Sequence, residues 1–306
     1  MRRVVSVSLG SSKRDKTSQV TILGQEFEIS RIGTDGDMKR FAELIRELDG
    51  KVDAIGLGGI DRYLWVGNRR YTFRDADKLA RIAKITPVVD GSGVKNTLER
   101  RTIEFLNERG IVEFGNAKVL VVCAVDRFGM AQTIAGLSKR VIFGDLMFNV
   151  GIPVPMRSYK TVKVLGYMLL PIITRLPFRW FYPTGEKQDK NEPKYEKYYR
   201  WADVIAGDFL IIKKTMPTVE SGALEGKIII TQTVTSEDTE MMIDRRVKIL
   251  VTSTPCYDGR YYATNVFEGV LITLLGKKPE DMTTADYEEL LERMQWQPTI
   301  TKFFED

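Results

Sequence analysis

A β-α-β unit begins in the stretch Val119-Leu-Val-Val-Cys-Ala-Val-Asp-Arg-Phe-Gly-Met-Ala131, where an apolar run passes through a short turn into helix-type spacing. The pattern predicts a strand over 119–123, a helix over 130–137 and a second strand over 140–143. Three more short apolar runs follow it at 203–206, 228–231 and 248–252, with intervals long enough for crossover helices. Such alternation predicts a parallel, doubly wound, Rossmann-like sheet.

The first hundred residues combine strands, helices and hairpins. Turn signals at Gly24-Gln25 and Gly67-Asn68 lie between apolar runs and predict two hairpins, and 97–108 has the spacing of an amphipathic helix. We therefore expect an N-terminal α/β substrate-binding domain over 1–115 and a Rossmann-like domain over 116–275. The tail over 276–306 is expected to supply a C-terminal helix that packs back on both domains.

Residues 159–188 interrupt the second domain with an apolar helix, which contains Pro171, and an aromatic loop. The apolar part is about 15 residues long, whereas about 20 are needed to span a bilayer. Three interpretations stay open for this insert. It packs between the domains, it forms a lid over an apolar substrate, or it lies at a dimer interface or a membrane surface through residues 162–182.

Composition excludes several classes of chemistry. None of the 306 residues is a histidine, so the chain has no Ser-His-Asp or Cys-His machinery and no histidine-ligated metal. The net charge is +5 with the basic residues dispersed, which argues against a nucleic-acid partner. The two cysteines are far apart and the start of the chain is too polar for a signal peptide, so we expect a cytoplasmic protein.

The turn after residue 123 occupies the place of a dinucleotide-binding turn. That turn needs glycines so that the backbone can approach a pyrophosphate at a helix N-terminus, and Gly129 is the glycine present here. Asp145 follows Cys123 by 22 residues, about where a ribose-binding carboxylate belongs. A nicotinamide site and a Rossmann-like domain without a cofactor both fit this pattern.

Four polar, glycine-rich loops follow expected strands in the first domain, at 10–15, 33–37, 56–61 and 90–97. Because the carboxyl ends of parallel strands face one edge of a sheet, we expect these loops to converge on a ligand cleft. Lys95 lies beside the start of a helix, a position that suits a carboxylate or phosphate. Without histidine, it is a candidate for proton transfer together with Asp61 and Asp90.

Several segments resemble shikimate/quinate 5-dehydrogenases, and more closely a clostridial-type group labelled quinate 5-dehydrogenase. They are Val4-Val-Ser-Val-Ser-Leu-Gly-Ser-Ser-Lys-Arg-Asp15, Asp90-Gly-Ser-Gly-Val-Lys-Asn-Thr-Leu-Glu-Arg100, Tyr182-Pro-Thr-Gly-Glu-Lys-Gln188 and Ala263-Thr-Asn-Val-Phe-Glu268. The resemblance implies a substrate domain followed by a Rossmann domain, NAD or NADP as cofactor, and a lysine–aspartate pair formed by Lys95 with Asp61 or Asp90.

The predicted site residues fall into two further groups. For the cofactor they are Gly129, Asp126, Asp145, Thr231 and Thr233. For the substrate they are Ser11, Ser12, Lys13, Ser92, Asn96, Thr97, Tyr182, Lys187 and Asn265.

These observations predict a homodimeric, nicotinamide-dependent oxidoreductase that acts on a hydroxyl or carbonyl of a quinate-like or more apolar small molecule, with no metal. The alternative is a non-redox ligand-binding or regulatory protein of Rossmann-like fold, with membrane or lipid association through 162–182 as a further possibility.

Overall fold

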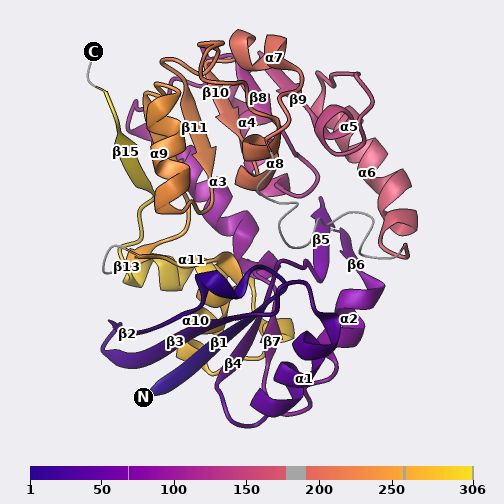
Figure 1. Cartoon of the computed structure of the whole chain (residues 1–306), viewed down its shortest axis with the longest axis vertical. Helices are drawn as coiled ribbons and strands as arrows, with labels where there is room; N and C mark the ends of the chain where they lie inside the picture. The colour runs from indigo at the N-terminus through magenta and orange to yellow at the C-terminus, as the bar shows by residue number, and fades with distance from the viewer. Residues whose placement is uncertain (68, 177–190, 258–259, 305–306) are drawn as a thin grey trace.

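The computed structural model describes residues 1–67, 69–176, 191–257 and 260–304, which form two α/β halves around two principal sheets. Figure 1 shows the first sheet in the lower part of the molecule, the second in the upper part, and helix α3 (Ser92–Glu108) running between them. The predicted fold class, an α/β domain with hairpins followed by a Rossmann-like doubly wound sheet, is confirmed.

The first sheet has the strand order β2-β3-β1-β4-β7 and is parallel except for the edge strand β2. Its strands are β1 (Arg2–Ser8), β2 (Lys16–Ile22), β3 (Gln25–Gly33), β4 (Ala54–Gly58) and β7 (Val88–Val89). Side chains alternate along each strand. Val5 and Val7 pack with helices α1 (Met38–Leu48) and α2 (Arg74–Ala80), whereas Val4 packs with α10 (Thr264–Leu275) on the other face.

The second sheet has the order β15-β12-β11-β10-β8-β9, in which only β15 is antiparallel. Its strands are β8 (Val119–Val121), β9 (Val141–Phe143), β10 (Val204–Ala206), β11 (Ile228–Thr231), β12 (Ile249–Thr252) and β15 (Thr299–Lys302). Helices α3 and α4 (Phe128–Leu137) cover one face, and α8 (Phe209–Thr215) and α9 (Ser236–Asp244) cover the other. The strand order reverses beside β8, because β9 lies on one side of β8 and β10 on the other.

The remaining elements connect or flank the halves. They are the hairpin β5 (Tyr63–Val66) with β6 (Arg69–Thr72), α5 (Asp145–Phe148), α6 (Tyr159–Ile173), α7 (Glu196–Trp201), the pair β13 (Cys256–Tyr257) and β14 (Arg260–Tyr261), α11 (Thr284–Arg293), and the short 3-10 helices η1 (Ser12–Arg14) and η4 (Pro279–Asp281). Both predicted hairpins are confirmed as β2–β3 and β5–β6.

Helix α3 begins before its predicted start at residue 97, directly after β7. Gly91 has a φ of 92°, and the Asp90 side chain accepts a hydrogen bond from the Ser92 N–H at 3.1 Å, so the chain turns at once into the helix. A glycine with positive φ followed by polar residues has the composition of a loop, which explains the error. Part of the predicted loop over 90–97 is therefore the first turns of α3.

The chain crosses between the halves three times. It leaves the first sheet through α3, returns after β12 to α10, and reaches β15 through α11. Helix α10, which the sequence prediction placed with the second domain, packs mainly on β4 and β1 of the first sheet. The predicted boundaries at 115 and 275 stay a prediction, but a boundary at 275 separates α10 from the sheet that it contacts.

Candidate functional site

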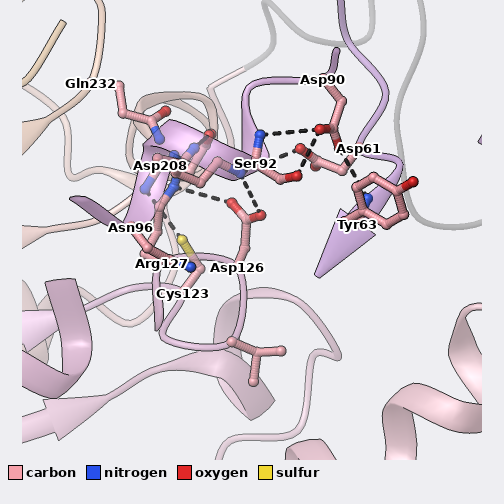
Figure 2. A network of polar contacts seen from close by, with 12 residues as sticks. Asp61, Tyr63, Asp90, Ser92, Asn96, Cys123, Asp126, Arg127, Asp208 and Gln232 are labelled. Carbon is pink, nitrogen blue, oxygen red and sulfur yellow. Dashed lines mark hydrogen bonds and ion pairs between the residues drawn. The ribbon is translucent and has the colours of Figure 1, made fainter. Parts of the chain in front are cut away.

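The carboxyl ends of both sheets face a buried polar cluster. Residues 122–127 follow β8 and Asp208 follows β10, so both loops lie where the strand order of the second sheet reverses. In doubly wound sheets this is the usual place for a ligand. From the first sheet, the residues after β4 and β7 supply Asp61 and Asp90. Figure 2 shows Asp61 and Asp90 on one side of the cluster and Arg127, Asp208 and Gln232 on the other.

Lys95 of α3 joins the two halves. Its Nζ atom lies 3.0 Å from Asp126 Oδ1 and 3.3 Å from Asp61 Oδ1, and the residue is 6% exposed. Burial alone lowers the pKa of this lysine, but Asp126 and Asp61 outweigh burial and hold the pKa above its ordinary value. Lys95 is therefore a cation and a hydrogen-bond donor at neutral pH. A proton-transfer lysine needs a pKa shift in the opposite direction.

Asp126 stays ionised in this pairing. Burial raises its pKa, but Lys95 and Arg127 outweigh burial and lower the pKa to about 2. The predicted Lys95–Asp61 pair is brought together, although Asp126, which was predicted to bind the cofactor, is the nearer partner.

Arg127 extends the cluster into the second half. The guanidinium, 3% exposed, lies 3.0 Å from Glu99 Oε1 and 3.1 Å from Asp126 Oδ2, and it also pairs with Asp208. Glu99 is completely buried and accepts a second hydrogen bond, at 2.8 Å, from Gln232 Nε2. Burial raises the pKa of Glu99 to about 7 despite Arg127 and Lys95. Two cations thus face four carboxyl groups, which gives the cluster a negative balance.

A small cavity opens beside Lys95, with room for about one water molecule. Its walls come from the β5–β6 hairpin, α3, the turn after β8 and the start of α4. The lining residues are Tyr63, Leu64, Trp65, Ser92, Lys95, Asn96, Asp126 and Phe128. They combine hydrogen-bond donors, acceptors and three aromatic rings.

Asp90 fixes one wall of this cavity. Its Oδ2 accepts the N–H groups of Arg62 and Tyr63 at 2.5 and 2.9 Å, and its Oδ1 accepts from the Ser92 N–H and hydroxyl. The carboxylate thus occupies the N-terminus of α3, where the sequence suggested a place for a substrate carboxylate or phosphate. Asp90 positions the hairpin and the helix, and its geometry does not favour the predicted proton-transfer role.

Two of the predicted cofactor residues, Gly129 and Asp145, serve the packing of the second half. A Cβ atom at Gly129 would lie 2.6 Å from the Asn96 carbonyl oxygen, so this glycine allows α4 to approach α3. Asp145 accepts the N–H groups of Ala124 and Val125, both at 2.9 Å, and so holds the turn after β8. Burial raises the Asp145 pKa to about 6.

The two predicted threonines lie at the end of β11, outside the cavity. Thr231 is fully buried and its hydroxyl has no hydrogen-bond partner among the described residues, whereas the Thr233 hydroxyl lies 3.3 Å from that of Thr254. Nothing tests the predicted binding of NAD or NADP, which stays a prediction.

The fold places the predicted substrate residues in different parts of the molecule. Ser92 and Asn96 line the cavity, and the Asn96 side chain also accepts the Gly129 N–H at 3.2 Å. Ser11, Ser12 and Lys13 lie instead in a loop at the end of β1, where the Ser12 N–H donates to Asp35 and the Ser11 carbonyl accepts from Arg31.

The other predicted substrate residues lie away from the cavity or outside the described part of the chain. Thr97 is buried within α3. Asn265 donates to Ser6 Oγ at 2.7 Å and so joins α10 to β1. Tyr182 and Lys187 lie outside the residues that the structure describes.

Sequence reasoning missed Arg127, Glu99, Asp208 and the aromatic residues of the hairpin. One signal was present: Lys95 and Glu99 are four residues apart, so a helix that includes both presents them on one face. Arg127 lies in a turn where glycines were expected, and a charged residue at the end of an apolar strand could have marked the position. Gln232 reaches Glu99 through long-range packing alone.

Two family models match the chain. The model described as Domain of unknown function (DUF8754) matches residues 93–303, and Domain of unknown function (DUF8753) matches residues 3–90. No curated protein matches.

Three of the similar solved structures are binding proteins whose sequences differ greatly from this one. The first is a sugar ABC transport system substrate-binding protein from Bordetella parapertussis 12822 (11% identity, TM-score 0.38, 98% of this chain and 89% of that chain). The second is an ABC transporter periplasmic solute binding protein from Actinobacillus succinogenes 130z with bound D-allose (12%, 0.40, 99% and 98%). The third is GanP, a glucose-galactose binding protein from Geobacillus stearothermophilus (10%, 0.40, 99% and 97%). TM-scores below 0.5 assign neither a fold nor a ligand to this chain.

These comparisons correct several predictions. Both family models that match the chain are domains of unknown function and neither describes a dehydrogenase, so the predicted relationship to shikimate/quinate dehydrogenases is wrong. The nicotinamide-dependent oxidoreductase is withdrawn with it, and the non-redox alternative fits the comparisons better. The predicted cytoplasmic location is also withdrawn: the similar structures include a protein described as periplasmic, and this likeness assigns no location to the chain. The predicted homodimer finds no support.

Proposed function

Since the chain belongs to the family described as Domain of unknown function (DUF8754), whose description names no activity, we propose a function from the geometry of the site. The protein binds a small, uncharged, hydroxyl-bearing molecule in the cavity beside Lys95, without redox chemistry. The observation that carries the proposal is the buried group of Lys95, Asp61 and Asp126 beside an aromatic-lined cavity at the carboxyl ends of both sheets.

The polar groups of the cavity suit hydroxyl groups. Lys95 donates, Asp126 accepts, and the amide of Asn96 has a group of each kind. A hydroxyl group both donates and accepts, so one ligand hydroxyl can bridge a cation and a carboxylate that already form a pair. The rings of Tyr63 and Trp65 offer flat apolar surfaces for the C–H faces of such a ligand.

The charge of the cluster disfavours an anionic ligand. Four carboxyl groups surround the two cations, and the N-terminus of α3 is occupied by the Asp90 carboxylate. A phosphate or carboxylate entering here would meet a negative balance in a poorly screened interior, where like charges repel strongly.

Ligand entry requires one wall of the cavity to move, because the present space holds about one water molecule. Helix α3 is an unsuitable moving part, since Val94 and Leu98 pack with α10 and α11 while Ile103 and Leu106 pack in the second core. The β5–β6 hairpin is a separate two-stranded sheet that supplies Tyr63, Leu64 and Trp65. We therefore propose that the opening movement involves this hairpin and breaks the hydrogen bonds from Arg62 and Tyr63 to Asp90 that hold it in its present position.

The test is calorimetric titration of the purified protein with two panels of compounds. One panel contains neutral monosaccharides and polyols, and the other contains sugar phosphates, carboxylic acids, NADH and NADPH. A neutral compound is expected to bind and, at about 100 times its Kd, to stabilise the fold by about 2.7 kcal/mol.

A pair of hairpin variants localises the binding. Trp65→Ala removes a ring from the cavity wall and is expected to weaken binding about tenfold, because aromatic contact and apolar burial contribute on the order of 1–2 kcal/mol. Arg69→Ala, an exposed change on the adjacent strand, is expected to leave the affinity unchanged. Preferential binding of the anionic panel, or equal affinity of the Trp65→Ala variant, would refute the proposal.

A further inference from the structure

Helix α6 presents an apolar face that the described part of the chain leaves uncovered. We define the α6 face as two sets of exposed side chains. On the helix they are Val164, Met168, Leu169 and Ile172, and in the preceding segment they are Val150, Ile152 and Val154. Met168 and Ile172 are 56% and 60% exposed. Single exposed apolar residues are ordinary, but Val164, Met168 and Ile172 recur at four-residue spacing along one side of the helix, and such a row indicates an interaction surface.

The opposite side of α6 explains why the helix is held in place. Val162, Gly166 and Leu170 are buried at four-residue spacing, and a Cβ at Gly166 would lie 3.0 Å from Val66, so the helix packs closely on the β5–β6 hairpin. The exposed residues 164, 168 and 172 have the same spacing and are offset by two positions, which places them on the other side of the helix. Packing within the protein thus accounts for one side of α6 and leaves the α6 face without a partner in the described part of the chain.

The sequence segment that carries the α6 face has charges of one sign. Residues 146–185 contain no aspartate or glutamate, although the chain has 41 in 306 residues. The same segment contains the five basic residues Arg157, Lys160, Lys163, Arg175 and Arg179. Of these, Arg157, Lys160 and Arg175 are exposed on α6 or directly beside it. A cation-flanked apolar surface matches an anionic lipid layer, whose headgroups are negative and whose interior is apolar.

The dimensions of α6 exclude a membrane-spanning role for this helix. It has 15 residues, which correspond to about 22 Å, whereas a bilayer core is about 30 Å thick. In the described ranges, the structure contains no helix with the length and hydropathy required to cross a membrane. A helix with one side packed on its own protein and the other exposed can lie along a membrane surface.

We propose that the α6 face docks on an anionic phospholipid surface, with its apolar side chains in the outer acyl region and its basic residues among the headgroups. A second copy of this chain is a poorer occupant. A two-fold interface would bring the same basic residues together, and residues 146–185 contain no carboxylate to pair with them. The proposal is independent of the ligand-binding function.

The test is sedimentation of the full chain with two kinds of vesicle, one of phosphatidylcholine alone and one of phosphatidylcholine mixed with phosphatidylserine as the minor component. The protein is expected to sediment with the serine-containing vesicles at about 50 mM salt and to be largely released at about 500 mM salt, because salt screens headgroup attraction. Equal binding to both vesicle types, or no binding to either, would overturn the proposal.

Three sets of variants separate the contributions. Met168→Glu and Ile172→Glu each place a negative charge on the exposed apolar side and are expected to abolish vesicle binding. The double change Arg157→Gln with Lys160→Gln is expected to weaken it about 25-fold, at about fivefold for each basic residue. Ile85→Glu changes a 77% exposed apolar residue in the first half and is expected to bind like wild type.

Thermal unfolding and size-exclusion chromatography complete the experiment. All of the substituted side chains are exposed, so the melting temperatures are expected to stay close to that of wild type. A wild-type dimer that Met168→Glu converts to a monomer would assign the α6 face to self-association and overturn the lipid proposal. Loss of binding by the Ile85→Glu control would overturn it as well.

Discussion

Glu268 is the residue whose environment most clearly sets a pH dependence. It lies on α10, is 3% exposed, and accepts hydrogen bonds from the Tyr287 hydroxyl at 2.8 Å and from the Gly91 N–H at 2.7 Å. Burial is the main cause that raises its pKa to about 8, and the charge of Asp90 adds to the effect. Glu268 therefore holds a proton at neutral pH in the folded protein, at the junction of α3, α10 and α11.

The raised pKa makes stability fall as pH increases. Between the ordinary glutamate pKa of 4.5 and the folded value of about 8, the folded state holds the proton more tightly than the unfolded state. The contribution of Glu268 is fully present below about pH 4.5 and is lost progressively up to about pH 8, by roughly 5 kcal/mol in total.

Glu268→Gln is expected to remove this contribution, because a neutral amide cannot release a proton. The free energy of unfolding is measured by urea titration at pH 5 and pH 9. Its decrease between these two pH values is expected to be about 4 kcal/mol smaller for the variant than for wild type. Glu280→Gln, a change in η4, serves as the control and should follow wild type. Parallel pH profiles for Glu268→Gln and wild type would contradict the assignment.

Individual site residues were predictable only where a strand end or a helical spacing marked them. Lys95, Asp61 and Asp126 follow or adjoin recognisable strand ends, and the structure brings their charged groups together. The direction of the Lys95 pKa shift depends on two carboxylates that lie 31 and 34 positions away in the chain. Such through-space pairing has no local signature, so the role of Lys95 could not be inferred from spacing.

Among the helices and strands, α3 is the one whose start depends most on a single residue, Gly91. Gly91 adopts a φ of 92°, and a Cβ there would lie 2.7 Å from the Asn265 backbone nitrogen of α10. The position thus requires both a left-handed conformation and the absence of a side chain. It allows the loop after β7, α3 and α10 to meet beside Glu268.

Gly91→Ala is expected to destabilise the fold by about 3 kcal/mol, from the left-handed strain and the steric clash together. Gly110→Ala is a matched control, because Gly110 also has a positive φ but has nothing within 4 Å of the added Cβ. It should cost about 1 kcal/mol. Chemical unfolding of both variants checks the difference, and equal costs would show that the contact with α10 is unimportant.

Elements with a strong apolar period were the most predictable. The spacing predicted a helix over 130–137, which is part of α4, and the helix interrupted by Pro171 is α6, which ends two residues beyond that proline. Strand β15 was missed because its sequence, Thr-Ile-Thr-Lys, is short and partly polar. It forms only by pairing with β12, where Lys302 lies opposite Ile249 although α10 and α11 separate the two strands in the chain.

At the scale of the whole molecule, α3 organises the two halves. Its first half packs with α10 and α11, and its second half packs in the core of the second sheet. Lys95 and Glu99, on the first half of the helix, carry the polar cluster. The fold class followed from the alternation of strands and helices. The placement of α10 on the first sheet did not, because the chain returns there only after it has formed strands β8 to β12 of the second sheet.

Because the chain has no histidine, the buried cluster is built from other charged groups. The buried cluster contains lysine, arginine and carboxyl groups, and the pKa values of Lys95 and Asp126 keep both charged at neutral pH. Lys95 and Asp126 are the charged groups that line the cavity, and their permanent, paired charges favour binding and orientation of a ligand over transfer of protons. This is the physical basis for proposing a binding protein.

Mass spectrometry of the small molecules released from natively purified protein tests the proposed function most directly. We expect an uncharged, hydroxyl-bearing compound at near-stoichiometric amount in wild type and a reduced amount in Trp65→Ala. Release of a nicotinamide nucleotide or another phosphorylated compound, retained equally by Trp65→Ala, would contradict it.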